Sequence, residues 1–403
     1  MLVRAPFPRI SANLAERACI RLERALGPSK VLTAPSRCAA YASDESEQEA
    51  APPDAVVLAA CAQDIATTLE VANALGVPVT PRGAGTGKSG GGVPVCGGIA
   101  LCTLGMNSIV EIDRDEFIAV VEPGVILGDL YAAVEAEGLF YPPDPNSWAL
   151  CALGGNIAEN AAGPRAFKYG VTRDYVLGLD VISAAGSRLQ LGRRTAKGVT
   201  GYDLTALMVG SEGTLALTVG ATLRLRRKPQ QVATLLGLFA TVAGAARAVS
   251  AIVAAGLVPR CLELIDRAAL QAMRRQGVAL DGRAGALLLM EVDGDVAACE
   301  RQLEEVGARA VDAGALEVLV AQDAAQRERL WAARRQLSHV TAKLARYKIS
   351  EDVVVPRTRM ADLVDEVMRI GERNEVHMLN YGHAGDGNLH VNLLWDEPAD
   401  AAR

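Results

Sequence analysis

The chain has 403 residues, half of them apolar and 22% charged, which allows two domains and excludes a long disordered region. Its formal net charge of −6, without a tail of like charges, gives no reason to expect nucleic-acid binding. The first nine residues lack the apolar core of a signal peptide, and no apolar run is long enough to span a membrane, so we expect a cytoplasmic protein.

The first predicted elements lead into a glycine-rich stretch. Residues 14–26 have the apolar spacing of a short helix, and the polar residues 41–49 predict an exposed loop. A βαβ unit is then predicted from a strand, a helix and a strand at residues 55–59, 64–75 and 77–80. The stretch 81–92 follows this unit directly.

Six of the twelve residues in the stretch 81–92 are glycine. Backbone N–H groups of such a run can approach an anion closely, because no Cβ blocks positive φ or close contact, so we predict a pyrophosphate-binding loop. A P-loop is disfavoured because Arg82 stands where its first glycine is required. A Rossmann fingerprint is disfavoured because further glycines and Pro94 follow instead of a helix. The alternative of a flexible linker is disfavoured by strand-like residues on both sides, at 77–80 and 99–104.

Two further small-residue stretches follow in the first half of the chain. A hairpin is predicted at residues 109–121 and a helix at 125–137, after which residues 141–147 break all regularity. The stretch 153–163 is too polar and too rich in glycine for core packing. A third stretch, at residues 200–215, ends in the turn Gly-Ser-Glu-Gly-Thr-Leu.

After Pro229 the pattern changes to strands and alanine-rich helices without glycine loops. We predict a first domain at residues 1–228 and a second, α+β domain at residues 229–403. The elements predicted in the second domain are strands at 232–239, 261–265, 286–292 and 317–321, a helix that ends at 255 and a helix through 306.

Two of the four histidines, His383 and His390, occur in a glycine-rich turn that leads into a strand. A chain reversal can bring both imidazoles to one centre, which suits a metal or a substrate. A purely structural role is the alternative, and the residues by themselves leave both open. His339 and His377 have no such context, and we expect them at the surface.

These stretches together resemble the FAD-linked oxidases of the vanillyl-alcohol oxidase type, also called the p-cresol methylhydroxylase (PCMH) type. The match is to the branch of D-lactate, glycolate and D-2-hydroxyglutarate dehydrogenases, and it covers nearly the whole chain. The resemblance implies an α+β fold in which a two-subdomain FAD-binding domain precedes a ferredoxin-like cap domain. The cap is expected to cover the reactive face of the flavin and to supply substrate contacts.

The resemblance also implies the residues that bind FAD. Asn156 and Asn160, at helical spacing, would offer amide groups to the flavin ring or its ribityl chain. The full set of expected cofactor contacts is Pro81, Arg82, Gly83, Ala84, Gly85, Thr86, Gly87, Ser89, Gly90, Pro143, Asp144, Gly154, Gly155, Asn156, Asn160, Gly163, Tyr169, Gly170, Glu212 and Gly213.

The eight cysteines are spread without the paired spacing of a metal site, which favours buried, reduced thiols. Cys151 lies near the expected flavin residues, so a covalent thioether to the flavin is conceivable. We expect noncovalent FAD, with Cys151 as a neighbour.

The run from His383 to His390 is a specific signature of this family. It implies that both histidines are catalytic and ligate a divalent metal such as Zn or Mn, and that Asn392 contacts the substrate. Arg334 matches the arginine that holds the substrate carboxylate, a role that a planar guanidinium suits. Ser338 and Lys348 match further substrate contacts, and Lys348 is also expected to be catalytic.

One family motif does not occur in this chain. Family members continue through a segment with the motif Gly-Glu-His-Gly, whose glutamate completes the metal site and whose histidine is the proposed base. This chain stops at Arg403 and contains no Glu-His pair. We therefore expect a cap domain that is incomplete at its C-terminus, and weak turnover.

The predicted function is the FAD-dependent oxidation of a small D-2-hydroxy acid, D-lactate or glycolate. The alternatives are D-2-hydroxyglutarate as substrate, a flavin-binding subunit with little activity of its own, and a remnant that binds no flavin. The expected electron acceptor is a quinone, a cytochrome, an electron-transfer flavoprotein or an iron–sulfur subunit. The predicted function is compatible with a homodimer, and with peripheral association of the protein with a membrane through its electron acceptor.

Overall fold

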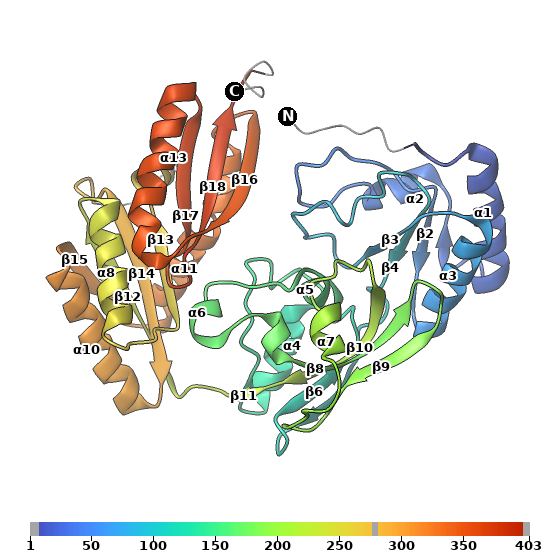
Figure 1. Cartoon of the computed structure of the whole chain (residues 1–403), viewed down its shortest axis with the longest axis horizontal. Coiled ribbons are helices and arrows are strands. Elements are labelled where there is room, and N and C mark those ends of the chain that lie inside the picture. Colours follow the sequence, from blue (N-terminus) through green and yellow to red (C-terminus); the bar gives the residue numbers. More distant parts are fainter. Residues whose placement is uncertain (1–7, 276–280, 398–403) are drawn as a thin grey trace. The chain divides into compact units, whose positions relative to one another are not determined.

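A computed structural model describes residues 8–275 and 281–397, in two compact units (Figure 1). The N-terminal unit holds the described residues up to Ala162 together with Gly170–Lys228. The C-terminal unit holds Gly163–Tyr169 and the described residues from Pro229 onward. Residues 1–7, for which the sequence predicts no signal peptide, lie outside the described residues.

The N-terminal unit begins with a four-stranded sheet in the order β1-β2-β4-β3. Strands β2, β4 and β3 run parallel, so the predicted βαβ unit is confirmed, with β4 between its two strands. One face packs against the two long helices, where Leu22, Ile65 and Leu101 are fully buried. The elements are α1 (Ala12–Leu26), β1 (Val31–Leu32), α2 (Pro35–Cys38), η1 (Ala39–Tyr41), β2 (Ala55–Leu58), α3 (Ala62–Leu75), β3 (Val79–Arg82) and β4 (Ile99–Cys102).

A five-stranded antiparallel sheet, in the order β5-β6-β10-β8-β9, completes this unit. The predicted hairpin at residues 109–121 is confirmed as β5 and β6. The elements of this part of the unit, in which β7 and β11 form a separate pair, are β5 (Ile109–Asp113), β6 (Ile118–Val121), α4 (Leu127–Ala136), β7 (Leu139–Phe140), α5 (Leu153–Glu159), η2 (Thr172–Tyr175), β8 (Val176–Ser183), β9 (Arg188–Gly192), α7 (Leu204–Met208), β10 (Ala216–Arg224) and β11 (Arg226–Arg227).

The C-terminal unit is built on a seven-stranded antiparallel sheet in the order β15-β12-β14-β13-β17-β18-β16. The strands predicted after residue 229 are all present. The elements are α6 (Ala166–Tyr169), β12 (Gln231–Phe239), α8 (Val242–Ala254), β13 (Cys261–Ile265), α9 (Arg267–Arg275), β14 (Ala286–Gly294), α10 (Val296–Asp312), β15 (Ala315–Val320), α11 (Ala324–Arg335), α12 (Leu337–Ala342), β16 (Tyr347–Val354), η3 (Arg357–Arg359), α13 (Met360–Asn374), β17 (His377–His383) and β18 (Asn388–Trp395).

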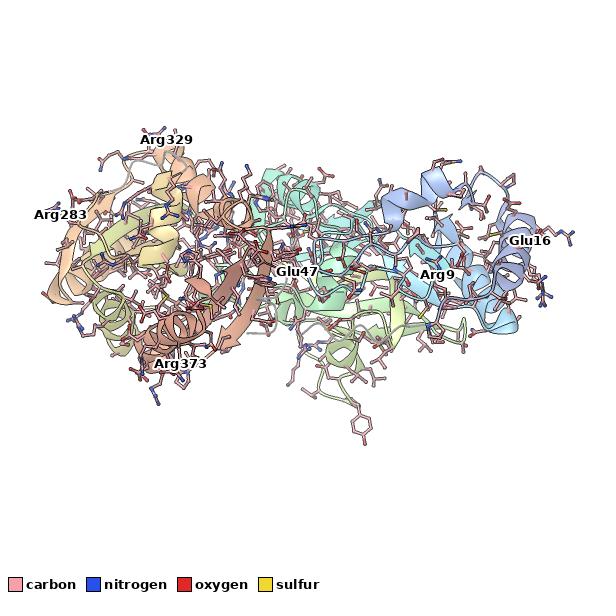
Figure 2. All side chains as sticks on the ribbon, turned by 90° about the horizontal axis from the view of Figure 1, so that it is seen from above. Arg9, Glu16, Glu47, Arg283, Arg329 and Arg373 are labelled. Atoms are coloured by element: carbon pink, nitrogen blue, oxygen red, sulfur yellow. The ribbon has the colours of Figure 1, made fainter. Side chains whose placement is uncertain are left out.

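Helices cover both faces of this sheet, and strand alternation assigns each side chain to one face. On β14, Leu288 and Met290 point into a core shared with α8, α10 and α13. Leu287 and Leu289 point the other way, into a core with α9, Trp331 of α11 and Leu337 of α12. We call the second side the α11 face. The labelled charges Arg283, Arg329 and Arg373, by contrast, project outward from the C-terminal unit (Figure 2).

Candidate active site

The glycine-rich stretch begins at the end of β3 and turns immediately. Gly85 has φ +76°, and a Cβ added there would lie 2.0 Å from the Arg82 guanidinium, which reaches across the loop to donate to the Gly92 carbonyl. The positive φ favours glycine at position 85, and any side chain there would have to displace the guanidinium. Among the described residues, no acceptor binds the backbone N–H groups of residues 83–87. Such a run of N–H groups suits a pyrophosphate, so the loop fits FAD.

The three predicted flavin stretches come together in the N-terminal unit. A Cβ on Gly83 would lie 3.2 Å from the Cβ of Ala152, just before α5, and one on Gly213 would lie 2.8 Å from the Pro81 ring. The Glu212 N–H donates to the carbonyl of Ala158 in α5 at 2.9 Å. Residues widely separated in sequence thus surround one region, as the family resemblance predicts.

Other predicted cofactor residues have structural partners. Ser89 donates to Glu159 at 2.8 Å, and the Tyr131 hydroxyl donates to the carbonyl of Pro143. Asn156 is buried in α5, but Asn160 is not on that helix: it has φ +51° and caps its end. Asn160 therefore lies just beyond the helix, and its side-chain oxygen accepts from the Arg173 N–H at 2.9 Å.

The predicted substrate residues converge on the α11 face of the C-terminal sheet. Strand alternation puts His383, His390, Asn392 and Lys348 on this face, while Arg334 projects from α11. The two imidazoles meet edge to face with their ring centroids 5.2 Å apart. Their side chains are 14% and 24% exposed, so both can be reached by a ligand.

A carboxylate that sequence reasoning missed, Glu263, lies at the centre of this cluster. It is fully buried on β13, directly opposite His383 of β17. One oxygen lies 2.6 Å from His383 Nδ1, and the other accepts from both Nε and a terminal nitrogen of Arg334, at 2.8 and 2.6 Å. A single carboxylate in the buried strand Cys261–Ile265 is the signal that could have revealed it.

The electrostatics of the two histidines differ. Burial by itself would raise the pKa of Glu263, but the charges of His383 and Arg334 lower this pKa to about 2. Burial would lower the pKa of His383, but the Glu263 carboxylate raises it. Burial lowers the pKa of His390, although His390 Nδ1 is hydrogen-bonded to Asp352. The two environments therefore push the pKa values of the neighbouring imidazoles apart.

The arrangement around Arg334 corrects its expected geometry. Glu263 occupies one edge of the guanidinium, through Nε and one terminal nitrogen, so a substrate carboxylate would have to approach the other terminal nitrogen. Arg334 also stacks over Tyr381, with its Cζ atom 5.0 Å from the ring centroid. Burial raises the pKa of Tyr381, while Arg334 and the polar side chains of Thr341, Ser338 and Asn392 oppose this rise, and the sequence did not single this tyrosine out.

Lys348 and Ser338 lie close together on this face. The Lys348 ammonium donates to the Thr341 hydroxyl at 3.0 Å and to the backbone carbonyl of Ser338 at 3.5 Å. Asn392 is fully buried and donates to the carbonyl of His390 at 3.0 Å. His339 and His377 are exposed, as predicted.

Within residues 8–275 and 281–397, no group of three His, Cys, Asp or Glu side chains is placed to hold a metal ion. His383 and His390 each contact a carboxylate through Nδ1, which leaves Nε2 of each ring as the nitrogen available to a ligand. A carboxylate paired with the other ring nitrogen is common for histidines that bind metals, so the chemistry of these two side chains is compatible with a metal.

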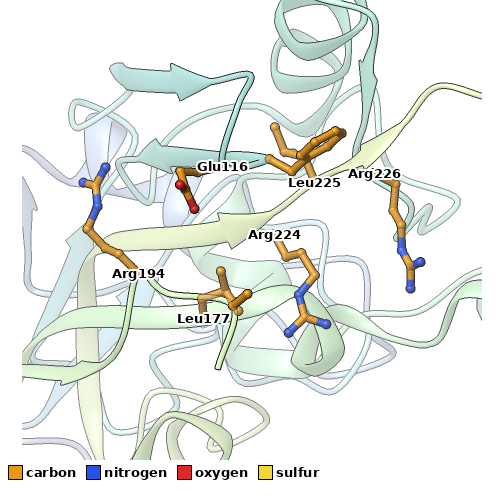
Figure 3. Close-up of a pocket in the computed structure, with 8 residues that line it drawn as sticks. Glu116, Leu177, Arg194, Arg224, Leu225 and Arg226 are labelled. Atoms are coloured by element: carbon orange, nitrogen blue, oxygen red, sulfur yellow. The ribbon is translucent and has the colours of Figure 1, made fainter. Parts of the chain in front are cut away.

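A separate pocket in the N-terminal unit carries three arginines, Arg194, Arg224 and Arg226, beside Leu177 and Leu225 (Figure 3). No predicted site residue lines it. Arg194 is paired with Glu111 at 2.8 Å, which gives this charge a structural partner.

In the described part of the chain, no helix combines the length and apolar character that crossing a membrane requires.

Comparisons with known proteins agree with this geometry. Residues 53–192 match the family described as FAD binding domain, and residues 228–403 match the family FAD linked oxidases, C-terminal domain. The glycolate oxidase subunit GlcD of Bacillus subtilis is 41% identical over 357 residues, which are 88% of this chain and 76% of that protein. GlcD of Escherichia coli is 36% identical, over 86% of this chain and 70% of its own. A D-lactate dehydrogenase of Anaerostipes hadrus is 34% identical, over 84% and 73%.

Solved structures share the fold at low sequence identity. p-Cresol methylhydroxylase superposes with a TM-score of 0.82 at 16% identity, over 98% of this chain and 85% of its own. Alkyldihydroxyacetonephosphate synthase superposes with a TM-score of 0.79 at 18% identity, over 98% and 83%. The predicted α+β fold of the PCMH type is confirmed, and the chain belongs to the family of FAD-linked oxidases.

Proposed function

We propose that this chain is an FAD-dependent dehydrogenase of a small D-2-hydroxy acid, with D-lactate and glycolate as the first candidate substrates. The observation that supports this most is the cluster on the α11 face, where two cations, Arg334 and Lys348, share one sheet face with two accessible imidazoles. A hydroxy acid offers the matching groups, a carboxylate and a neighbouring hydroxyl. The names of the relatives, glycolate oxidase subunit and D-lactate dehydrogenase, point to the same substrate class.

When bound, FAD would supply the hydride acceptor at its N5 atom. The backbone N–H groups of residues 83–87 would hold its pyrophosphate, with the remaining predicted cofactor residues around it. The Cys151 thiol is buried, and burial raises its pKa, so the thiol stays protonated at neutral pH. A protonated thiol is a poor nucleophile, which supports noncovalent binding.

The chain's own residues would orient the substrate. Because Glu263 occupies one edge of Arg334, the remaining terminal nitrogen of Arg334 and the Lys348 ammonium are the groups that would contact the substrate carboxylate. Both cations are held by hydrogen bonds before the substrate binds, which reduces the entropy cost of orienting it. Asn392 and Ser338 are proposed as further contacts.

The two histidines would bind the substrate hydroxyl through Nε2, directly or through a divalent metal such as Zn²⁺ or Mn²⁺. Glu263 and Asp352 fix the orientation of the rings through Nδ1. Polarising the hydroxyl makes its proton easier to remove while hydride leaves the same carbon.

The electron acceptor is proposed to be a quinone, a cytochrome, an electron-transfer flavoprotein or an iron–sulfur subunit. The subunit naming of the GlcD relatives favours a protein partner. A flavin-binding subunit with little activity of its own is the second candidate, and it would work within such an assembly. D-2-Hydroxyglutarate is the second candidate substrate.

The test is the anaerobic visible absorbance of protein reconstituted with FAD, with and without Zn²⁺ or Mn²⁺, while D-lactate, glycolate and D-2-hydroxyglutarate are added in turn. Bleaching of the flavin is the expected result, and the substrate that bleaches it fastest identifies the preferred acid. A metal that accelerates bleaching in the wild type, but not in His390→Gln, would support the proposed role of the histidines.

Two other outcomes would contradict the proposal. A flavin spectrum that stays oxidised with all three acids would favour the flavin-binding subunit. A protein that stays colourless after reconstitution would exclude the proposed function altogether.

A further inference from the structure

A short stretch of the flavin-binding sequence folds with the C-terminal unit. Gly163–Tyr169 lies inside the match to the FAD-binding family, between the flavin helix α5 and Gly170. Its contacts nevertheless group it with the sheet that begins after Pro229. Residues of the C-terminal unit must therefore contact Gly163–Tyr169 and keep this stretch in place.

Asp293, near the end of β14, binds the last two residues of this stretch, Lys168 and Tyr169. The Lys168 ammonium contacts Asp293 Oδ1 at 2.5 Å and the Asp293 backbone carbonyl at 2.9 Å. The Tyr169 hydroxyl donates to Oδ2 at 2.8 Å. Arg260, which is also buried, donates to the same oxygen at 2.9 Å. The Asp293 side chain is 0% exposed, so its charge depends on these three donors.

The middle of the same stretch packs against the histidine turn. A Cβ added to Gly385 would lie 2.6 Å from the Phe167 ring, so the close approach of Phe167 requires glycine there. Arg357 stacks over the Phe167 ring at 5.6 Å and donates to the Gly385 carbonyl at 3.2 Å. Gly385 lies between His383 and His390 in sequence. One stretch thus contacts both the turn that carries the histidines and Asp293 of β14.

We infer that Asp293 is a positioning residue for the flavin, although it lies outside the FAD-binding sequence match. By fixing Lys168 and Tyr169, Asp293 orders the residues that lead directly into Gly170. The inference rests on the proposed function, since Gly163, Tyr169 and Gly170 are proposed cofactor contacts. FAD affinity should then depend on a carboxylate of the C-terminal sheet.

Glu291 provides a matched control, because it lies two residues before Asp293 on the same strand and face. It is buried as well and contacts Arg260 at 3.0 Å. Its other partners are Thr234 and Trp331, at 2.9 and 2.7 Å, and neither these nor Arg260 belongs to residues 163–169. Glu291→Gln therefore perturbs the same buried network without touching the flavin stretch.

The experiment compares Asp293→Asn, Glu291→Gln and the wild type as full chains. FAD affinity is measured by titration of visible absorbance, and hydrogen–deuterium exchange of residues 163–170 is followed without FAD. An asparagine at 293 replaces one acceptor oxygen with a donor facing a cation, so we expect FAD to bind at least about tenfold more weakly. Exchange of residues 163–170 should accelerate in Asp293→Asn but not in Glu291→Gln.

Tyr169→Phe removes the hydrogen bond from the Tyr169 hydroxyl to Asp293 and keeps the charges, so it tests the inference if Asp293→Asn folds poorly. It should weaken FAD binding by a smaller factor, about threefold to tenfold. Equal effects of Asp293→Asn and Glu291→Gln on FAD affinity, or unchanged exchange of residues 163–170 in Asp293→Asn, would overturn the inference while leaving the proposed function intact. A wild type that binds no FAD would overturn both.

Discussion

The predicted sites of the two units depend on different kinds of interaction. In the N-terminal unit, the flavin stretches depend on backbone: glycines at positive φ, close approaches that a Cβ would block, and N–H groups of residues 83–87. In the C-terminal unit, the substrate cluster depends on buried charges, with Glu263 serving both Arg334 and His383. A substitution that adds a Cβ should therefore disturb the predicted flavin site most. A substitution that removes a charge should disturb the proposed substrate cluster most.

The largest effect on stability is expected from Glu263→Ala. The substitution leaves Arg334 and His383 without the buried carboxylate that both contact. Removing one partner of a buried ion pair costs about 3–5 kcal/mol in the free energy of unfolding, because a charge remains buried and uncompensated. Urea denaturation of the wild type and the variant measures this difference.

A surface pair in the same unit gives the control. Glu366→Gln breaks the contact between Glu366 and Arg369, whose side chains are 46% and 63% exposed. Its expected effect on the free energy of unfolding is within about 0.5 kcal/mol. If Glu263→Ala cost less than about 1 kcal/mol, the carboxylate would not be the centre of the cluster.

Gly85→Ala tests the backbone-built site by adding one methyl group. A left-handed φ costs an alanine about 1–2 kcal/mol, and the new Cβ must also displace the Arg82 guanidinium. We expect the affinity for FAD to fall about a hundredfold, measured by absorbance titration. Gly76→Ala is the control, since Gly76 has left-handed backbone with φ +67° and ψ +38°, but nothing lies within 4 Å of its Cβ. An equal loss of FAD affinity in both variants would mean that strain alone, rather than the shape of the loop, is responsible.

The same contrast explains what the sequence could predict. The βαβ unit, the glycine loop and the hairpin at residues 109–121 follow from local patterns, because backbone conformation depends strongly on residues close in sequence. The strand Cys261–Ile265 was also predicted, but the partners of Glu263 were not. His383 is 120 residues away and reaches Glu263 through the pairing of β13 with β17, which no local pattern encodes. The occupied edge of Arg334 was missed for the same reason. Asn160 follows the last residue of α5, and its positive φ gives its side chain a direction that differs from that of a helical residue.

Buried charge in the C-terminal unit should also be visible in the pH dependence of stability. Asp266 is fully buried, and burial raises its pKa from 3.8 to about 6. The folded chain therefore binds this proton more tightly than the unfolded chain, so Asp266 makes stability fall as the pH rises from about 4 to about 6. The expected change is up to about 2 kcal/mol.

Asp266→Asn removes this titration, at the cost of one acceptor oxygen for the N–H groups of Ala269 and Asn380. The variant is expected to be less stable overall, but the difference from the wild type should shrink as the pH rises from 4 to 6. Urea denaturation at several pH values measures the difference. A constant difference over this range would assign the pH dependence to other groups.

The smallest effect is expected from Ser338→Ala, which changes KM for the hydroxy acid. Comparing it with Lys348→Gln separates an uncharged contact from a charged one within the same cluster. The hydrogen bonds from Lys348 and Thr341 end on the Ser338 backbone carbonyl, which Ser338→Ala retains. The lost hydroxyl is uncharged and lies among the polar side chains around Tyr381, so KM for the hydroxy acid should rise less than about threefold. Lys348→Gln removes the charge proposed to hold the substrate carboxylate, and KM should then rise about tenfold or more while FAD affinity stays unchanged. If the two variants raised KM equally, the site would recognise the acid by shape and hydrogen bonding rather than by the charge of Lys348.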